Sequence, residues 1–281
     1  MKSLVASEWS CVFNQCIQCH KTRRGQEVPK NDSPAVSAWD IALALVLLTR
    51  LPLPELPSRV FTRQSNASWA FPLVGLVISA MACLVGWILS GLNQPPPVSA
   101  AIVLTLLIVT TGAMHEDGLA DTADGLWGGF TRERRLEIMK DSHIGTYGVL
   151  ALILSQLLRW ALITALITTG MFLALIAAAV WSRALMPVMM AALPNARKSG
   201  LSHGVGAPTK KTCIGGLLLA LGINGVLIGS GSLMPAAISV LLFIGLALIA
   251  KAKIGGQTGD ILGATQQITE ISFLMTILAS T

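Results

Sequence analysis

The sequence predicts an all-α protein, a polytopic transmembrane helical bundle with about six to seven spans and a short re-entrant or interfacial helix near its N-terminus. Three observations lead to this fold class. The 281 residues are 53% hydrophobic and only 12% charged, which is half of the roughly 25% that is usual in soluble domains. The mean hydropathy is +0.68. A single Tyr, 13 Pro and the lack of strict alternation argue against an outer-membrane β-barrel.

The expected spans are apolar stretches of about 20 residues, the length that crosses a bilayer. Residues 39–49 are too few to cross comfortably, so we expect a re-entrant or interfacial helix there. Residues 268–280 are also a short stretch. The longer stretches are 69–91, 98–114, 146–168, 171–193, 213–230 and 232–250.

Basic and neutral segments alternate between these stretches. Lys and Arg gather in 115–145, 194–212 and 251–267, whereas 92–97, 169–170 and 231 contain none. The positive-inside rule therefore predicts a multi-pass membrane protein with the basic segments in the cytoplasm. In such a protein the net charge of +6 indicates orientation, and we expect no nucleic-acid partner.

Acidic side chains are concentrated in the run from His115 to Gly125. On a helix, Asp117, Asp121 and Asp124 occupy positions i, i+4 and i+7, within an arc of roughly 60°. No Lys or Arg occurs between them and Arg132 to compensate their charge. Such a stripe next to basic residues favours Mg²⁺ bridging a phosphorylated substrate. The alternative is an ordinary acidic cytoplasmic loop.

The sequence offers further candidates for the same site. Glu116 and Asp260, the latter in a glycine-rich turn, could join the three aspartates as metal ligands. Glycines that let backbone N–H groups approach a phosphate, and cations that could bind one, follow the acidic run or face the same side. Arg183 lies inside a span, where it needs an acidic partner or an anionic substrate. The predicted substrate-binding residues are Gly125, Gly128, Gly129, Arg134, Arg135, Lys140, Arg183 and Arg197.

At these residues the chain resembles the cobalamin synthase family, also called adenosylcobinamide-GDP ribazoletransferases. The most specific segments are HEDGLADTADGLWGG at 115–129 and RRLEIMKDSHIGTYG at 134–148. Supporting matches are FPLVG at 71–75, LPNARKSG at 193–200 and GGQTGD-x-LGA-x-Q at 255–266. The resemblance covers roughly residues 40–281. It departs at His143, where the family pattern has Arg before Ile-Gly-Thr-Tyr-Gly.

The resemblance implies a membrane transferase that joins adenosylcobinamide-GDP to α-ribazole or its 5′-phosphate and releases GMP. It also implies Mg²⁺ as cofactor, a place in the bacterial inner membrane with a cytoplasmic active face, and a complex with other enzymes of nucleotide-loop assembly. We expect Asp117, Asp121, Asp124 and His115 to be catalytic, and one of the carboxylates to accept the proton of the attacking ribose hydroxyl.

Other functions compete with this interpretation. Another Mg²⁺-dependent membrane phosphotransferase or a prenyltransferase would also use clustered Asp residues. The chain, however, has D-x-x-D-G-x-x-G-G at 121–129 without the Ala-Arg of the lipid-alcohol pattern, and no D-D-x-x-D pair. A transporter would place polar groups at mid-membrane in two matching halves. Here most acids lie at the end of a span.

Residues 1–38 form a polar N-terminal extension, and residues 39–281 a single integral membrane catalytic domain. Cys16, Cys19 and His20 spell the C-x-x-C-H pattern of c-type haem attachment. Together with Cys11 they could instead supply four zinc ligands. We favour a dispensable extension over both.

Overall fold

The computed structural model describes residues 36–280, and apart from one isolated bridge every element in this range is a helix. The predicted extension over 1–38, with its Cys16–His20 pattern, therefore lies almost entirely outside the described residues. The main elements are α2 (Trp39–Leu48), α4 (Phe71–Gly91), α5 (Pro96–Thr111), α6 (Met114–Gly128), α7 (Arg132–Ile138), α8 (Thr146–Thr168), α9 (Phe172–Ala192), α10 (Leu201–Val205), α11 (Lys210–Ile228), α12 (Leu233–Ile254) and α13 (Gly259–Ala279). Short pieces η1 (Ser58–Arg63), α3 (Gln64–Ala67) and η2 (Ser68–Ala70) precede α4, and η3 (Gly229–Ser232) joins α11 to α12.

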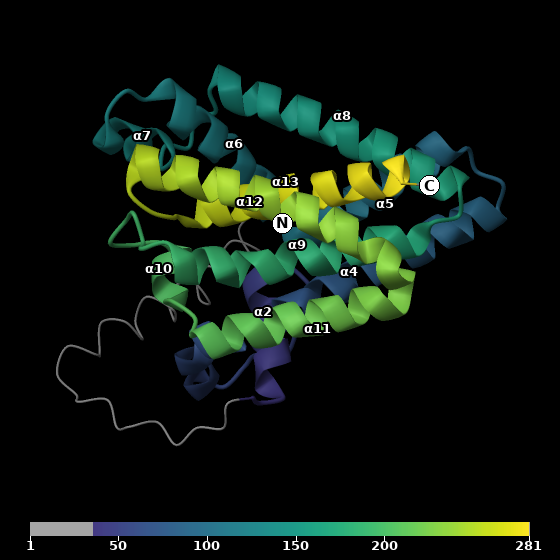
Figure 1. The fold of residues 1–281 in the computed structure, drawn as a ribbon, viewed down its shortest axis with the longest axis horizontal. Helices are drawn as coiled ribbons and strands as arrows, with labels where there is room; N and C mark the ends of the chain where they lie inside the picture. Colours follow the sequence, from purple (N-terminus) through teal and green to yellow (C-terminus); the bar gives the residue numbers. More distant parts are fainter. Residues whose placement is uncertain (1–35, 281) are drawn as a thin grey trace, which may run out of the picture.

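Within the described residues, 5 continuous helical segments are long and apolar enough to cross a membrane, or 6 if a bent pair counts as one span. One of these segments is the 45 residues Lys210–Ile254. A straight helix of that length would be about 68 Å long, twice the thickness of a bilayer core. Gly229 interrupts it with a φ of +61°, and the chain turns back between α11 and α12 (Figure 1). This segment therefore contains both spans expected there.

The bent pair is α5 and α6. The single span predicted over 98–114 is wrong, because α5 ends before residue 114 and is continued by a second helix. Helix α5 ends at Thr111, because Gly112 and Ala113 take left-handed backbone conformations with φ of +64° and +58°. The chain then turns by 85° into α6. The acidic run is therefore neither the end of a straight span nor a loop: it is a helix of its own, packed against α8 and α13.

Helices α9 and α13 form the centre of the bundle. Helix α9 packs against α4, α11 and α13. Of the most apolar stretch of this helix, 83% is buried inside the protein. For α13 the buried share is 78%. Because α13 faces protein rather than lipid, it tolerates polar side chains. The helix therefore extends beyond the apolar stretch expected over 268–280 and begins at Gly259. The ten-residue α2 is too short to span, as predicted.

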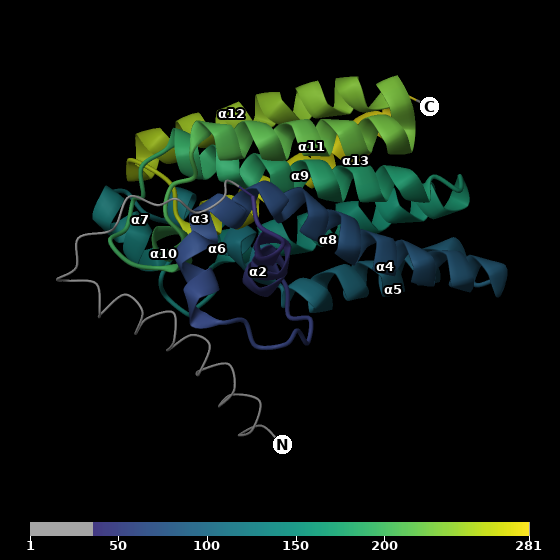
Figure 2. The ribbon, with the colours of Figure 1, turned by 90° about the horizontal axis from the view of Figure 1, so that it is seen from below.

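The two kinds of connection lie at opposite ends of the bundle. In Figure 1 helix α7, the basic segment that contains α10 and the turn from α12 to α13 lie at the left end, and the uncharged connections α4–α5, α8–α9 and α11–α12 lie at the right end. Figure 2 shows the same separation from below. The helices thus run between a charged end and a neutral end, as the alternation along the sequence predicts.

Candidate active site

A cavity of about 200 Å³ opens among α2, α4, α6, α9, α13 and the segment 195–205, towards the charged end of the bundle. Asp117, Asp260 and Arg197 are the charged residues of its wall, and the imidazole of His115 also lines it. The rest of the wall is largely apolar, with Met186 among its members. The cavity thus joins acids from two distant parts of the sequence to a cation from a third.

Two glycines bring these parts together where α6 crosses α13. A Cβ atom added to Gly118 would lie 2.9 Å from the carbonyl oxygen of Asp260, and one added to Gly263 would lie 3.0 Å from that of His115. Only glycine allows backbones to approach so closely. The first turn of α13, with Asp260, therefore lies directly against the first turns of α6.

The carboxylates at this crossing carry more negative charge than the protein compensates. Asp260 pairs with Arg197 at 3.1 Å and accepts a hydrogen bond from the Thr258 hydroxyl at 3.1 Å. Asp117 and Asp121 accept no hydrogen bond from the described part of the chain, and Asp121 experiences the negative charge of both Asp260 and Asp117. Three carboxylates thus share one Arg197, which leaves a site that attracts a cation.

Asp124, the last member of the predicted stripe, has a different environment. Its carboxylate accepts hydrogen bonds from the backbone N–H groups of Gly145 at 2.7 Å and Gly148 at 2.8 Å, at the start of α8. Seven helical residues also separate it from Asp117 by about 10 Å along the axis, too far for both to ligate one ion. Among the described residues no three His, Cys, Asp or Glu side chains are placed to hold a metal by themselves. The structure therefore does not bring the five predicted ligands together.

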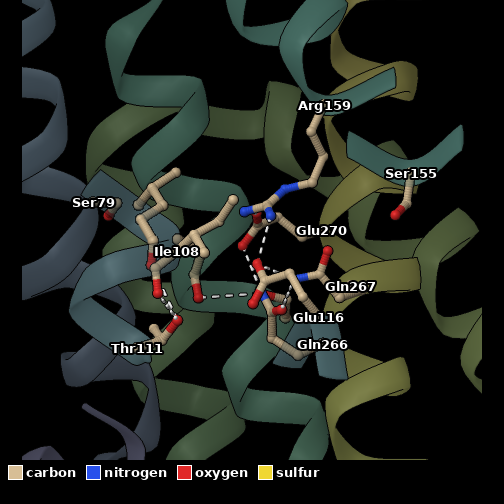
Figure 3. A network of polar contacts seen from close by, with 12 residues as sticks. Ser79, Ile108, Thr111, Glu116, Ser155, Arg159, Gln266, Gln267 and Glu270 are labelled. Carbon is tan, nitrogen blue, oxygen red and sulfur yellow. Dashed lines mark hydrogen bonds and ion pairs between the residues drawn. The ribbon is translucent and has the colours of Figure 1, made fainter. Parts of the chain in front are cut away.

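Glu116 belongs to a buried network of charges rather than to the cavity (Figure 3). Arg159 pairs with Glu116 at 2.7 Å and with Glu270 at 2.9 Å, and Arg183 lies 3.4 Å from the second oxygen of Glu270. Gln267 donates a further hydrogen bond to Glu116 at 3.0 Å. The network balances two arginines against two glutamates and joins α6, α8, α9 and α13. It provides the acidic partner that Arg183 requires.

His115 is only 1% exposed, and its Nε2 atom has no hydrogen-bond partner in the described structure. The residue also lines the cavity, although the Nε2 atom itself is covered by surrounding atoms. Burial keeps an imidazole neutral, since the charged form loses its hydration. His115 can therefore act as a proton acceptor next to the carboxylates.

The remaining predicted binding residues lie outside the cavity wall, with the exception of Arg197. Gly125 and Gly129 leave room for Met139 and Arg135 of α7, and Gly128 lies next to Ile138. Arg135 donates to the carbonyl groups of Gly129 and Lys253 at 2.9 and 3.0 Å. Arg134 pairs with Glu137 on the surface, and Lys140 is exposed. These glycines and Arg135 pack α7 against α6 and the end of α12.

Several cavity residues were not predicted from the sequence. Met186 and Met190 are separated by one turn of α9, and Gln257 and Ser202 lie in the segments that flank Asp260 and His203. Met and Leu residues in an apolar span resemble any other core residues. Only the Arg197 and Asp260 motifs indicated that these segments contribute to a site.

Comparison with known proteins settles the family. Residues 40–278 match the family described as cobalamin-5-phosphate synthase. The chain belongs to this family. It is 42% identical over 245 residues to the adenosylcobinamide-GDP ribazoletransferase of Mesorhizobium japonicum, covering 86% of this chain and 94% of the relative. It is 44% identical over 248 residues to that of Bradyrhizobium diazoefficiens, covering 85% and 93%.

No solved structure matches the chain. Membership of the cobalamin-5-phosphate synthase family confirms the resemblance seen in the sequence. It also decides against the transporter, prenyltransferase and lipid phosphotransferase alternatives.

His143, the position that departs from the family pattern, forms an ion pair with a neighbouring aspartate. His143 replaces the expected Arg, and its Nδ1 atom lies 2.7 Å from Asp141. The hydrogen bond that the His143 imidazole donates to Asp141 raises the pKa of this exposed histidine above its ordinary value. The positive form of this histidine is therefore favoured, which partly replaces the charge of an arginine.

Glu270→Gln should destabilise the protein by about 3–5 kcal/mol, because it leaves Arg183 and one side of Arg159 as buried charges without a carboxylate. Thermal unfolding of the detergent-purified protein measures this. The control is Glu137→Gln in the pair with Arg134, whose side chains are both 65% exposed; it should change stability by about 0.5 kcal/mol or less. A Glu270→Gln protein as stable as the wild type would contradict the role of the network.

Proposed function

We propose that this chain joins adenosylcobinamide-GDP to α-ribazole or its 5′-phosphate and releases GMP, the final step in assembling the nucleotide loop of cobalamin. Ribazoletransferase is the activity named for its relatives over most of their length. The observation that carries the proposal within this chain is the single cavity lined by Asp117, Asp260 and Arg197. The catalytic unit is residues 39–281, because the family match covers 40–278. A complex with other enzymes of the pathway stays a prediction.

The carboxylates of the cavity suit Mg²⁺. Hard oxygen ligands are those it prefers, and it is usually held by one or two carboxylates together with substrate phosphates and water. Asp117 and Asp260 supply this number, and Asp121 adds negative charge from one turn along α6. When bound, the ion would neutralise charge on the pyrophosphate of adenosylcobinamide-GDP.

The protein's own groups then account for positioning and proton transfer. Arg197, already next to Asp260, can contact a phosphate oxygen by charge-assisted hydrogen bonds. The neutral imidazole of His115, which lines the cavity, accepts the proton of the attacking ribose hydroxyl. The hydroxyl oxygen forms the new bond to the phosphorus attached to cobinamide, and the bond to GMP breaks.

We also propose that the charged end of the bundle faces the cytoplasm of the bacterial inner membrane. The relatives are bacterial proteins, and the helices that could span a membrane make the chain multi-pass. The concentration of Lys and Arg at the end with α7 and α10 supports this orientation.

Cysteine labelling in intact cells tests the orientation. Ser142 and Asn93 are exposed at the charged and the neutral end, respectively. A membrane-impermeant maleimide should modify Asn93→Cys in intact cells but Ser142→Cys only after permeabilisation, with the wild-type chain as the background. Labelling of Ser142→Cys alone in intact cells would reverse the orientation.

GMP release by the purified protein tests the function and its metal site. Given adenosylcobinamide-GDP, α-ribazole and Mg²⁺, the wild type should release GMP, and Asp117→Asn should reduce this rate by about 100-fold or more. Asp260→Asn should raise the Mg²⁺ concentration for half-maximal activity by about tenfold, equivalent to about 1.4 kcal/mol.

The matched control for these variants is Asp141→Asn, an exposed aspartate that does not line the cavity. Its Mg²⁺ requirement should stay at the wild-type value. An unchanged requirement in Asp260→Asn, combined with lower thermal stability, would assign Asp260 to a structural ion pair with Arg197 instead.

A further inference from the structure

We propose that the apolar part of the cavity is the subsite for the base of the incoming α-ribazole, a fused two-ring aromatic group. This inference rests on the proposed function and extends it, because it assigns one of the two substrates to a particular set of side chains. The subsite is formed by Leu48, Phe71, Met114, Met186, Met190 and Leu262.

The lining of this subsite suits an apolar aromatic group. Met186 and Met190 present one face of α9, Leu48 comes from α2 and Phe71 from α4, and all four are at most 5% exposed. None of their side chains offers a strong hydrogen-bond donor or acceptor. Methionines adapt their shape and make favourable contacts between sulfur and aromatic rings.

The size of the cavity also shows which group of the two substrates can enter it. A cavity of about 150 Å³ in a protein core is known to hold one benzene molecule. The whole cavity here, its charged part included, has a volume of about 200 Å³, which is of the size that a small planar base occupies. The corrin ring of adenosylcobinamide-GDP is a macrocycle that greatly exceeds this volume, so it must remain outside the cavity.

Guanine, the other aromatic group among the substrates, carries several polar edge groups that the apolar side chains of this subsite cannot match. Gln257 donates to Asn195 at 2.7 Å and accepts from the Ser202 hydroxyl at 2.6 Å. These three polar side chains of the wall thus bond to one another. Against the apolar side chains guanine would bury polar edge groups without partners, at a cost that a benzimidazole-type base avoids.

The location of the charged residues supports the same assignment. Asp117, Asp260 and Arg197 line the same cavity as the apolar side chains. A nucleoside whose base enters the apolar part would therefore keep its ribose beside the carboxylates and His115. This is the arrangement that attack by a ribose hydroxyl requires.

Steady-state kinetics on the full-length protein in detergent test the subsite. Met186→Ala and Met190→Ala each remove contacts to the base, so the KM for α-ribazole should rise about fivefold or more, while the KM for adenosylcobinamide-GDP changes by less than about twofold. The matched control is Met189→Ala, which removes an equally buried methionine of α9 that does not line the cavity. Its KM for α-ribazole should match the wild type.

Calorimetric titration with α-ribazole measures the Kd for this substrate in the absence of turnover. The Kd should rise by a similar factor in Met186→Ala and stay unchanged in Met189→Ala. A rise in the KM for adenosylcobinamide-GDP alone would overturn the proposal and assign the subsite to guanosine, and an unchanged Kd in both Met186→Ala and Met190→Ala would also overturn it. If the wild type binds α-ribazole with this dependence but releases no GMP, the proposed function fails while the subsite stands.

Discussion

The requirement that buried charges be paired determines how the helices of this protein are arranged. Arg159 and Arg183 lie in apolar helices, and both are at most 3% exposed. A buried charge without a partner costs several kcal/mol, so Glu116 and Glu270 must reach the same place. This condition fixes the rotation of α6 and α13 relative to α8 and α9. The position of the cavity residues depends on that rotation.

Helix α6 uses its acids in three different ways because they follow one another around the same helix. Glu116 faces the buried network, and the next residue, Asp117, is turned by about 100° towards the cavity. Asp124, about two turns further on, binds the backbone at the start of α8. The first and last of these contacts hold the helix from both ends. Asp117 is therefore presented by a rigid element, which is what catalysis by positioning requires.

Much of the fold and part of the candidate site could be predicted from the sequence. Composition and the length of the apolar stretches indicated the bundle, and the acidic run that carries Asp117, Asp121 and Asp124 is helical, as its spacing suggested. The 85° turn after α5 could not be predicted, because Ala113 adopts a left-handed conformation that is unusual for alanine. The partner of Arg159 and the engagement of Asp124 depend on contacts between distant segments, and hydrophobic periodicity carries no information about those.

The cavity combines features that each oppose stability, and their combination is best explained by ligand binding. Asp117, Asp121 and Asp260 repel one another and share one Arg197, and His115 keeps a buried nitrogen without a partner. A protein selected for stability alone would neutralise these charges, as it does in the buried network of Glu116 and Glu270. The contrast between a charge-balanced network and a site with excess negative charge on the same two helices is the pattern expected where binding takes precedence over stability. A metal ion and the phosphates of a substrate would supply the missing charges, so the site becomes electrostatically complete only when it is loaded.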